Sequence, residues 1–313
     1  AFQGNADAAQ AAYQNAIDQD AQNPAAYFRL GQLYQNRKMF EEALANYDRA
    51  LALNPRLMDV FTNKVLVHAA REQLDQALAL CDEKLAQYPD DATVAPIVYN
   101  LKGSLLLAQR NRGPAETAFK KAIEMNPNFL QPYYTLARIY LSEDRADDAV
   151  AQYESILDKD PKQAGPHMML GTIYEMQQQY DLAEQHYRKT LEIDPDFAPA
   201  ANNLAYILAS SNRNIDEALT FARKAKEIMP EDANVMDTLG WIYYHKGFYD
   251  NAIAELSDAL AKLSDNPTVH YHLAMAYYKN GDTGKAKELL EKALSLAEEF
   301  EGAEEARQTL AQL

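Results

Sequence analysis

The sequence predicts an all-α fold, a solenoid of stacked helical hairpins, from three observations. First, six prolines recur at a nearly constant interval: Pro55, Pro89, Pro127, Pro161, Pro195 and Pro230 are 34, 38, 34, 34 and 35 residues apart. Second, an alanine stands twelve residues before each of them. Third, glycine or alanine stands about 24 residues before five of the six. A fixed period of this length is the signature of a repeat architecture.

The columns of this repeat predict two helices in each unit. In the first full repeat, Leu30, Gly31 and Tyr34 are spaced to share one face of a helix. The small residue lets a second helix approach closely, and Ala43 and Tyr47 lie four apart on that second helix. Proline then ends the unit, because it cannot continue a helix. Since each hairpin is covered only by its neighbours, the hairpins must stack.

At these residues the sequence resembles the tetratricopeptide repeat (TPR) family, in a form common in bacteria. The stretch "AAYFRLGQLY…EEALANYDRALALNP" matches the family signature at Tyr27, Leu30, Gly31, Tyr34, Ala43, Tyr47, Ala50 and Pro55. The resemblance implies a right-handed α-solenoid of about eight and a half hairpins with a C-terminal capping helix. It covers nearly the whole chain as one solenoid domain.

Eight full repeats follow one another along the chain. We place them at residues 24–57, 58–91, 96–129, 130–163, 164–197, 198–232, 233–266 and 267–300. Residues 1–23 fit the second half of a truncated repeat, with Gly4, Ala9, Tyr13 and Ala16 at the matching positions. Residues 301–313 are rich in Glu and amphipathic, as expected for the polar capping helix that a solenoid needs.

Two irregularities interrupt the period. Four extra residues, Ala92 to Ala95, precede Pro96, and one extra residue falls within "SSNRNIDEAL" of the sixth repeat. The first insertion is either a plain loop or a hinge that bends the stack, and the sequence favours neither.

Composition excludes several functional classes. The 313 residues carry a formal charge of −16, which argues against binding to a phosphate backbone. No apolar run is long enough to cross a membrane, so no direct membrane insertion of this segment is expected. A single cysteine, Cys81, excludes a disulfide framework and a Cys-based zinc site. With no catalytic or phosphate-binding motif, we expect no enzyme, no cofactor and no metal.

The resemblance also implies a ligand groove, lined by the first helix of each repeat. Of its 48 positions only six are charged, including Arg138, Glu175 and Asp237. The later repeats place aromatic, sulfur-containing and amide side chains there, which suit a peptide groove because they cover apolar surface without demanding one ligand shape. The candidate groove residues are Tyr134, Arg138, Met168, Met169, Asn202, Asn203, Tyr206, Asp237, Trp241, Tyr244, His245, Tyr271, His272, Met275 and Tyr278.

Packing is the alternative role for the large residues of this set. Trp241 and Tyr206 could pack mainly against the first helix of the next repeat, since large apolar side chains are usually buried. The groove lacks the lysines of the carboxylate clamp found in some relatives. Only Asn63 and Asn203 match the asparagine ladder of others.

These features predict a non-enzymatic scaffold that binds a peptide or helix of a partner protein during multi-protein assembly. One alternative is glycan recognition in bacterial exopolysaccharide assembly or export, because "DTLGWIYYHKGFYDNAIAEL" looks like repeat proteins of exopolysaccharide and exosortase systems. Another is the regulatory arm of an enzyme whose catalytic domain would precede Ala1 in the same protein. A bacterial, periplasmic or membrane-tethered location is favoured slightly over the cytoplasm. Self-association through the truncated N-terminal end is a further expectation.

Overall fold

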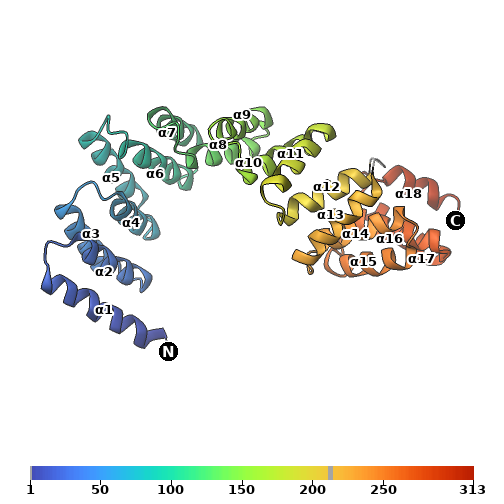
Figure 1. The fold of residues 1–313 in the computed structure, drawn as a ribbon, viewed down its shortest axis with the longest axis horizontal. Helices are drawn as coiled ribbons and strands as arrows, with labels where there is room; N and C mark the ends of the chain where they lie inside the picture. The colour runs from blue at the N-terminus through green and yellow to red at the C-terminus, as the bar shows by residue number, and fades with distance from the viewer. Residues whose placement is uncertain (1, 211–213) are drawn as a thin grey trace. The chain divides into compact units, whose positions relative to one another are not determined.

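The computed structural model describes residues 2–210 and 214–313, and the side chains from residue 6 onward within these ranges. In this described part every regular element is a helix, α1 to α18, which confirms the all-α fold of helical hairpins (Figure 1). By their contacts the helices divide into two compact units, Ala1–Ser155 and Ile156–Leu313.

The first unit begins with a single helix and continues with pairs. Its helices are α1 (Phe2–Gln19), α2 (Pro24–Asn36), α3 (Phe40–Leu53), α4 (Met58–Ala70), α5 (Leu74–Gln87), α6 (Ala95–Ala108), α7 (Arg112–Met125), α8 (Gln131–Leu141) and α9 (Ala146–Leu157), the last of which continues just past the boundary.

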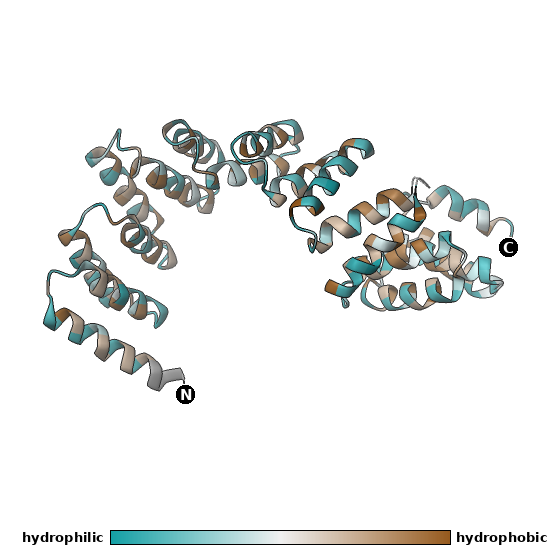
Figure 2. Ribbon diagram, in the orientation of Figure 1, coloured by the Kyte–Doolittle hydropathy of each residue, from teal (hydrophilic) through white to brown (hydrophobic). Residues whose placement is uncertain are grey.

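The second unit contains four further pairs and a short last helix. These are α10 (Ala164–Met176), α11 (Tyr180–Ile193), α12 (Ala198–Ser210), α13 (Ile215–Ile228), α14 (Ala233–His245), α15 (Tyr249–Lys262), α16 (Pro267–Asn280), α17 (Thr283–Leu296) and α18 (Ala303–Leu310). Figure 2 shows α12 as mainly hydrophobic and α18 as mainly hydrophilic, in keeping with an inner and a terminal helix.

In the hairpins that carry glycine on the first helix, the glycine faces a large residue of the second helix, as the repeat pattern predicts. A Cβ added to Gly31 would lie 2.5 Å from Cε1 of Tyr47, and one added to Gly171 would lie 2.6 Å from the same atom of Tyr187. Both tyrosines are fully buried. The absent side chain is therefore the space that the ring fills, and any larger residue would force the two helices apart.

The insertion before Pro96 forms an ordered turn. The Asp91 carboxylate accepts hydrogen bonds from the backbone amides of Thr93 and Val94, at 2.9 and 3.1 Å. Val94 and Ala95 are buried in the apolar cluster shared by α4, α5 and α6. The extra residue expected within "SSNRNIDEAL" falls partly on residues 211–213, outside the described residues, and the side chain of Gly4 is likewise outside them.

At the N-terminal end, α1 packs against α2. Ile17 is buried with Ala26 and Leu30, and Tyr13 and Ala16 pack against them. In α5, Cys81 is fully buried, and burial raises the pKa of its thiol to about 12. The protonated thiol therefore behaves as a small apolar side chain at neutral pH.

Candidate functional site

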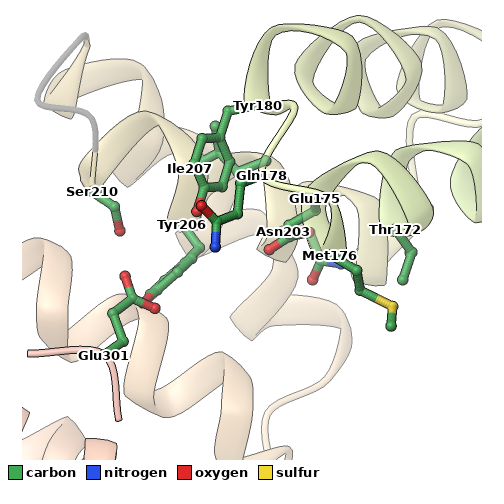
Figure 3. Close-up of a pocket in the computed structure, with 10 residues that line it drawn as sticks. All are labelled: Thr172, Glu175, Met176, Gln178, Tyr180, Asn203, Tyr206, Ile207, Ser210 and Glu301. Carbon is green, nitrogen blue, oxygen red and sulfur yellow. The ribbon is translucent and has the colours of Figure 1, made fainter. Parts of the chain in front are cut away.

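A cavity of about 640 Å³ opens on the second unit, on the face formed by the first helices of its hairpins. Helices α10 and α12 supply most of its walls (Figure 3). The walls are completed by the turn that leads from α10 into the start of α11, and by the segment between α17 and α18. Its lining residues are Thr172, Glu175, Met176, Gln178, Tyr180, Asn203, Tyr206, Ile207, Ser210 and Glu301.

The repeat pattern explains why α10 and α12 present these side chains. Gly171 and Ala205 face inward at equivalent positions of the two helices, and both are buried. Thr172 and Tyr206 follow them directly, so they turn away from the hairpin interior toward the cavity. Each is only half-buried.

A hydrogen-bonded chain connects the cavity with the buried core. The hydroxyl of Tyr187 donates to Oε2 of Glu175 at 2.5 Å and accepts from Nδ2 of Asn203 at 3.1 Å. Asn202 adds a longer contact, 3.4 Å, from its Nδ2 to Oδ1 of Asn203. Because Tyr187 is fully buried, these bonds fix Glu175 and Asn203 in place before any ligand arrives.

The electrostatics of the cavity are acidic. Burial raises the pKa of Glu175, the hydrogen bond from Tyr187 opposes this, and the negative charge of Glu301 adds to the rise. The Tyr206 hydroxyl points toward the Glu301 carboxylate (Figure 3), and burial followed by that carboxylate raises the pKa of Tyr206 above its usual range. Within the described residues, neither glutamate forms an ion pair with a lysine or arginine.

The rim of the cavity is apolar and accessible. Met176 is 77% exposed and Tyr180 is 46% exposed. Leu182, in the first turn of α11, is exposed beside them. Large exposed apolar side chains that gather at the mouth of a polar cavity are typical of an interaction site.

A second group of predicted groove residues lies further along the unit, on α14 and α16. The ring of Trp241 stacks on His272, with centroids 4.0 Å apart and an interplanar angle of 17°, and on Tyr244 at 4.6 Å and 5°. His272 in turn contacts Asp237, with 2.9 Å between Nδ1 and Oδ1. These residues therefore form one stack that joins neighbouring repeats.

The C-terminal segment covers this stack. Phe300 packs on Tyr271 with ring centroids 6.1 Å apart, and the Tyr271 hydroxyl donates to Oε2 of Glu305 at 2.8 Å. Gly302 lies directly on the Tyr271 ring, where an added Cβ would be 2.2 Å from Cε1. Ala306 of α18 completes the cluster. As a result Trp241 is 8% exposed, Tyr271 2% and His272 1%.

The fifteen predicted residues lie in different environments. Asn203 and Tyr206 line the cavity. Met168, Met169 and Asn202 lie half-buried on the same two helices, whereas Trp241, Tyr271, His272 and Met275 are buried. Asp237, Tyr244 and Tyr278 are half-buried and His245 is exposed. Tyr134 and Arg138 belong to α8 of the first unit, where Arg138 is exposed and Tyr134 contacts Tyr153 edge-on.

Several cavity residues were not among the predicted ones. Glu175 carried a signal, since it is one of the six charged groove positions, and Met176 follows it. Tyr180 lies at the start of a second helix, where the pattern predicts no ligand contact. Glu301 follows the last repeat, so no repeat position could assign it to a groove.

Two other features, a metal-holding cluster and a membrane-spanning helix, are not found among the described residues. Residues 2–210 and 214–313 contain no group of three or more His, Cys, Asp or Glu side chains placed to hold a metal ion. Among the same residues, no helix combines the length and apolar character that crossing a membrane requires.

Comparison with protein families gives matches along most of the chain. Models described as tetratricopeptide repeat match residues 1–39, 24–57, 100–164, 134–198, 186–220 and 267–300, and one described as TPR repeat matches residues 240–281. Together these matches cover residues 1–57, 100–220 and 240–300.

A curated relative in sequence is the TPR repeat-containing protein PA4667 of Pseudomonas aeruginosa. It is 26% identical over 243 residues, which are 77% of this chain and 35% of the relative. The chain thus spans about a third of the length of this relative, and less of the other curated relatives that it matches.

Solved structures of similar fold include three repeat proteins. The Cut9–Hcn1 structure matches with a TM-score of 0.57 and 18% identity, over 96% of this chain and 57% of that one. PilF of Pseudomonas aeruginosa matches with a TM-score of 0.55 and 17% identity, over 68% of this chain and 97% of that one. YrrB is described as a TPR protein with an unusual peptide-binding site. It matches with a TM-score of 0.50 and 23% identity, over 62% of this chain and 99% of that one. At these identities the likeness concerns the fold.

Proposed function

Because this chain belongs to the tetratricopeptide repeat family, whose fold serves as a protein–protein interaction scaffold, we propose that its second unit binds a segment of a partner protein in the cavity between α10 and α12. The observation that carries this proposal is the cavity itself. It combines fixed polar groups, Glu175 and Asn203, with an accessible apolar rim at Met176 and Tyr180.

The chemistry of the cavity suits a peptide. Asn203 and the Tyr206 hydroxyl can exchange hydrogen bonds with main-chain amides, while the rim accepts apolar side chains. Because the polar groups are already held by Tyr187, binding does not have to order them first. On this proposal the chain acts by binding alone, as a scaffold during assembly of a multi-protein complex.

Two alternatives from the sequence have less support. Glycan stacking on the predicted Trp241 and Tyr271 would need their faces to be free, yet both residues are buried. Self-association through α1 would need large apolar side chains at its surface. Within residues 6–19 the exposed positions of α1 hold only alanine and polar residues.

Photo-crosslinking tests the proposal. Benzoylphenylalanine at Met176, on the rim, is expected to crosslink a discrete partner protein in the native cell. The matched control carries the same residue at Phe248, which is exposed in the turn between α14 and α15 and lies outside the cavity. It should not crosslink this partner.

A filled cavity sharpens this test. Thr172→Tyr adds a ring to the cavity wall and gives up the long contact, 3.4 Å, between the Tyr187 hydroxyl and Oγ1 of Thr172. It should abolish the crosslink from position 176 while circular dichroism stays unchanged. Equal crosslinking from both positions, or crosslinking that ignores Thr172→Tyr, would contradict binding in this cavity.

A further inference from the structure

We propose that the segment bound in the cavity presents a lysine or arginine side chain, whose charged end lies between the carboxylates of Glu175 and Glu301. This inference rests on the proposed function and adds the chemical class of the ligand. It follows from the ion pairs that other half-buried glutamates form in the same chain.

Half-buried glutamates in this protein are paired with cations. In the described residues six glutamates are half-buried, and five of them form an ion pair with a lysine or arginine. The paired residues are Glu116 with Lys120, Glu143 with Arg112, Glu184 and Glu217 with Arg188, and Glu255 with Lys226. The sixth is Glu175, which has only the Tyr187 hydroxyl as a partner among these residues.

An unpaired carboxylate in such a place is costly. Partial burial weakens its hydration, and the hydroxyl of Tyr187 satisfies only one of its two oxygens. Glu301 brings a second negative charge to the same cavity, and the interaction of the two is unfavourable in the absence of a cation. A cation from a partner would relieve both effects at once.

The walls fit the rest of a basic side chain. Lysine and arginine bury a methylene stem along apolar surface and keep the charged end at a polar site. Met176 and Ile207 provide apolar surface beside Glu175, and the Tyr180 and Tyr206 rings lie on the same wall (Figure 3). A guanidinium could in addition lie over an aromatic face. The formal charge of −16 would favour the approach of a basic segment.

The contrast with Asp237 supports the assignment. This half-buried acid of the same surface has its own partner, since its Oδ1 lies 2.9 Å from Nδ1 of His272. The Asp237 carboxylate is therefore already engaged by a partner within the chain. Among the acidic residues on this face, the pair Glu175 and Glu301 is the one left for an external cation.

Degenerate peptides test the inference. Five pools of fluorescein-labelled nonapeptides would differ only at the central position, which holds arginine, lysine, citrulline, norleucine or glutamate. Citrulline has the shape of arginine without its charge. By fluorescence polarisation, the arginine and lysine pools should bind the full chain about tenfold more tightly than the citrulline and norleucine pools.

Neutral variants locate the preference. Glu175→Gln keeps an oxygen that can accept from Tyr187 but removes the charge, and it should reduce the arginine-to-citrulline ratio about tenfold. Glu301→Gln should reduce the ratio in the same direction. Glu291→Gln, an exposed position on α17 outside the cavity, changes the net charge equally and should leave the ratio unchanged.

The outcomes separate the two proposals. Pools that bind without a basic preference, yet lose binding in Thr172→Tyr, would overturn this inference and leave the proposed function standing. A basic preference that survives Glu175→Gln would also overturn it. If Thr172→Tyr leaves the binding of every pool unchanged, both proposals fall.

Discussion

One position of the repeat is exposed to solvent in hairpins of the first unit and buried in hairpins of the second. In the first unit the residue that follows the small-residue position on the first helix is exposed in three hairpins, as Leu66, Ser104 and Arg138. In the last two hairpins of the second unit the same position holds Trp241 and Met275, which are 8% and 2% exposed. The backbone places all five on the same face of their helices, so helix geometry does not cause the difference.

The difference arises from the C-terminal segment of the chain. Phe300 and Gly302 pack on Tyr271 of α16, and Ala306 belongs to the buried cluster that also holds Trp241 and Met275. Because this cover reaches only part of the second unit, the cavity between α10 and α12 stays open beside it, with Glu301 at its edge. A position on this face of a first helix is thus accessible only where no other segment of the chain covers it.

The largest effect is expected from removing the fit between Gly302 and Tyr271. Gly302 has a φ of +92°, and a Cβ there would be 2.2 Å from Cε1 of Tyr271. Gly302→Ala should destabilise the covered end by about 3 kcal/mol, the sum of a strained left-handed backbone and an overpacked contact. Trp241 is the only tryptophan, so its emission in urea titrations reports the loss.

Gly281→Ala is the matched control for this change. Gly281 has the same φ of +92° but nothing within 4 Å of an added Cβ. It should cost only about 1 kcal/mol, for the backbone strain. It should leave Trp241 protected from acrylamide. Equal costs for the two variants would mean that the contact with Tyr271 does not hold the cover in place.

Acid should weaken the second unit through a half-buried pair of histidines, His167 and His186. Nδ1 of His186 lies 3.0 Å from Nδ1 of His167, and burial, then the charge of His167, lowers the pKa of His186 to about 4. The unfolded chain takes up this proton near pH 6.5 and the folded chain only near pH 4, so stability falls as the pH drops between these values. The expected loss is about 1–2 kcal/mol, since water screens a half-buried ring.

His186→Gln isolates this contribution. Glutamine can still donate to His167 but takes up no proton, so the variant should lose less stability than the parent between about pH 6.5 and 4. Urea unfolding, monitored by the emission of Trp241, measures the stability of both proteins at each pH. Parallel losses in the two proteins would assign the acid sensitivity to other groups.

A smaller effect is expected from the hydrogen bond between Tyr271 of α16 and Glu305 of α18. Tyr271→Phe removes the bond to Glu305 but keeps the ring, and it should weaken the cover by about 1 kcal/mol. Faster amide hydrogen exchange in α18 is the measurement. Tyr278→Phe on the same helix removes a hydroxyl that makes no bond to α18 and should leave the exchange unchanged. If Tyr278→Phe speeds exchange equally, the bond to Glu305 is not what holds α18.

The repeat pattern predicted the helical hairpins because their cause is local. A small residue such as Gly31 and a ring such as Tyr47 recur at fixed spacing, and that spacing sets the pairing of the two helices. The pattern also indicated which residues leave the hairpin interior on the first helices. Asn203 and Tyr206, predicted for the groove, do line the cavity.

Coverage could not be predicted in the same way. Trp241 stacks on His272 of the next first helix, which is the packing alternative that the pattern left open, and it shares a buried cluster with Ala306, which lies outside the repeats and obeys no period. Glu301, which lines the cavity, likewise lies outside the repeats. Periodicity describes how a residue relates to its own helix and its neighbours, whereas a segment that folds back is set by contacts without a sequence rhythm.

The smallest expected effect tests this account most directly. In a Trp241→Phe background, Leu66→Trp moves the single indole to the equivalent position of the first unit, where Leu66 is 44% exposed. Stability should change by less than about 0.5 kcal/mol relative to that background, because the site is at the surface. Acrylamide should quench the relocated indole strongly and Trp241 of the parent weakly. Equal protection at both positions would mean that burial follows the place in the repeat, and that the C-terminal segment is not its cause.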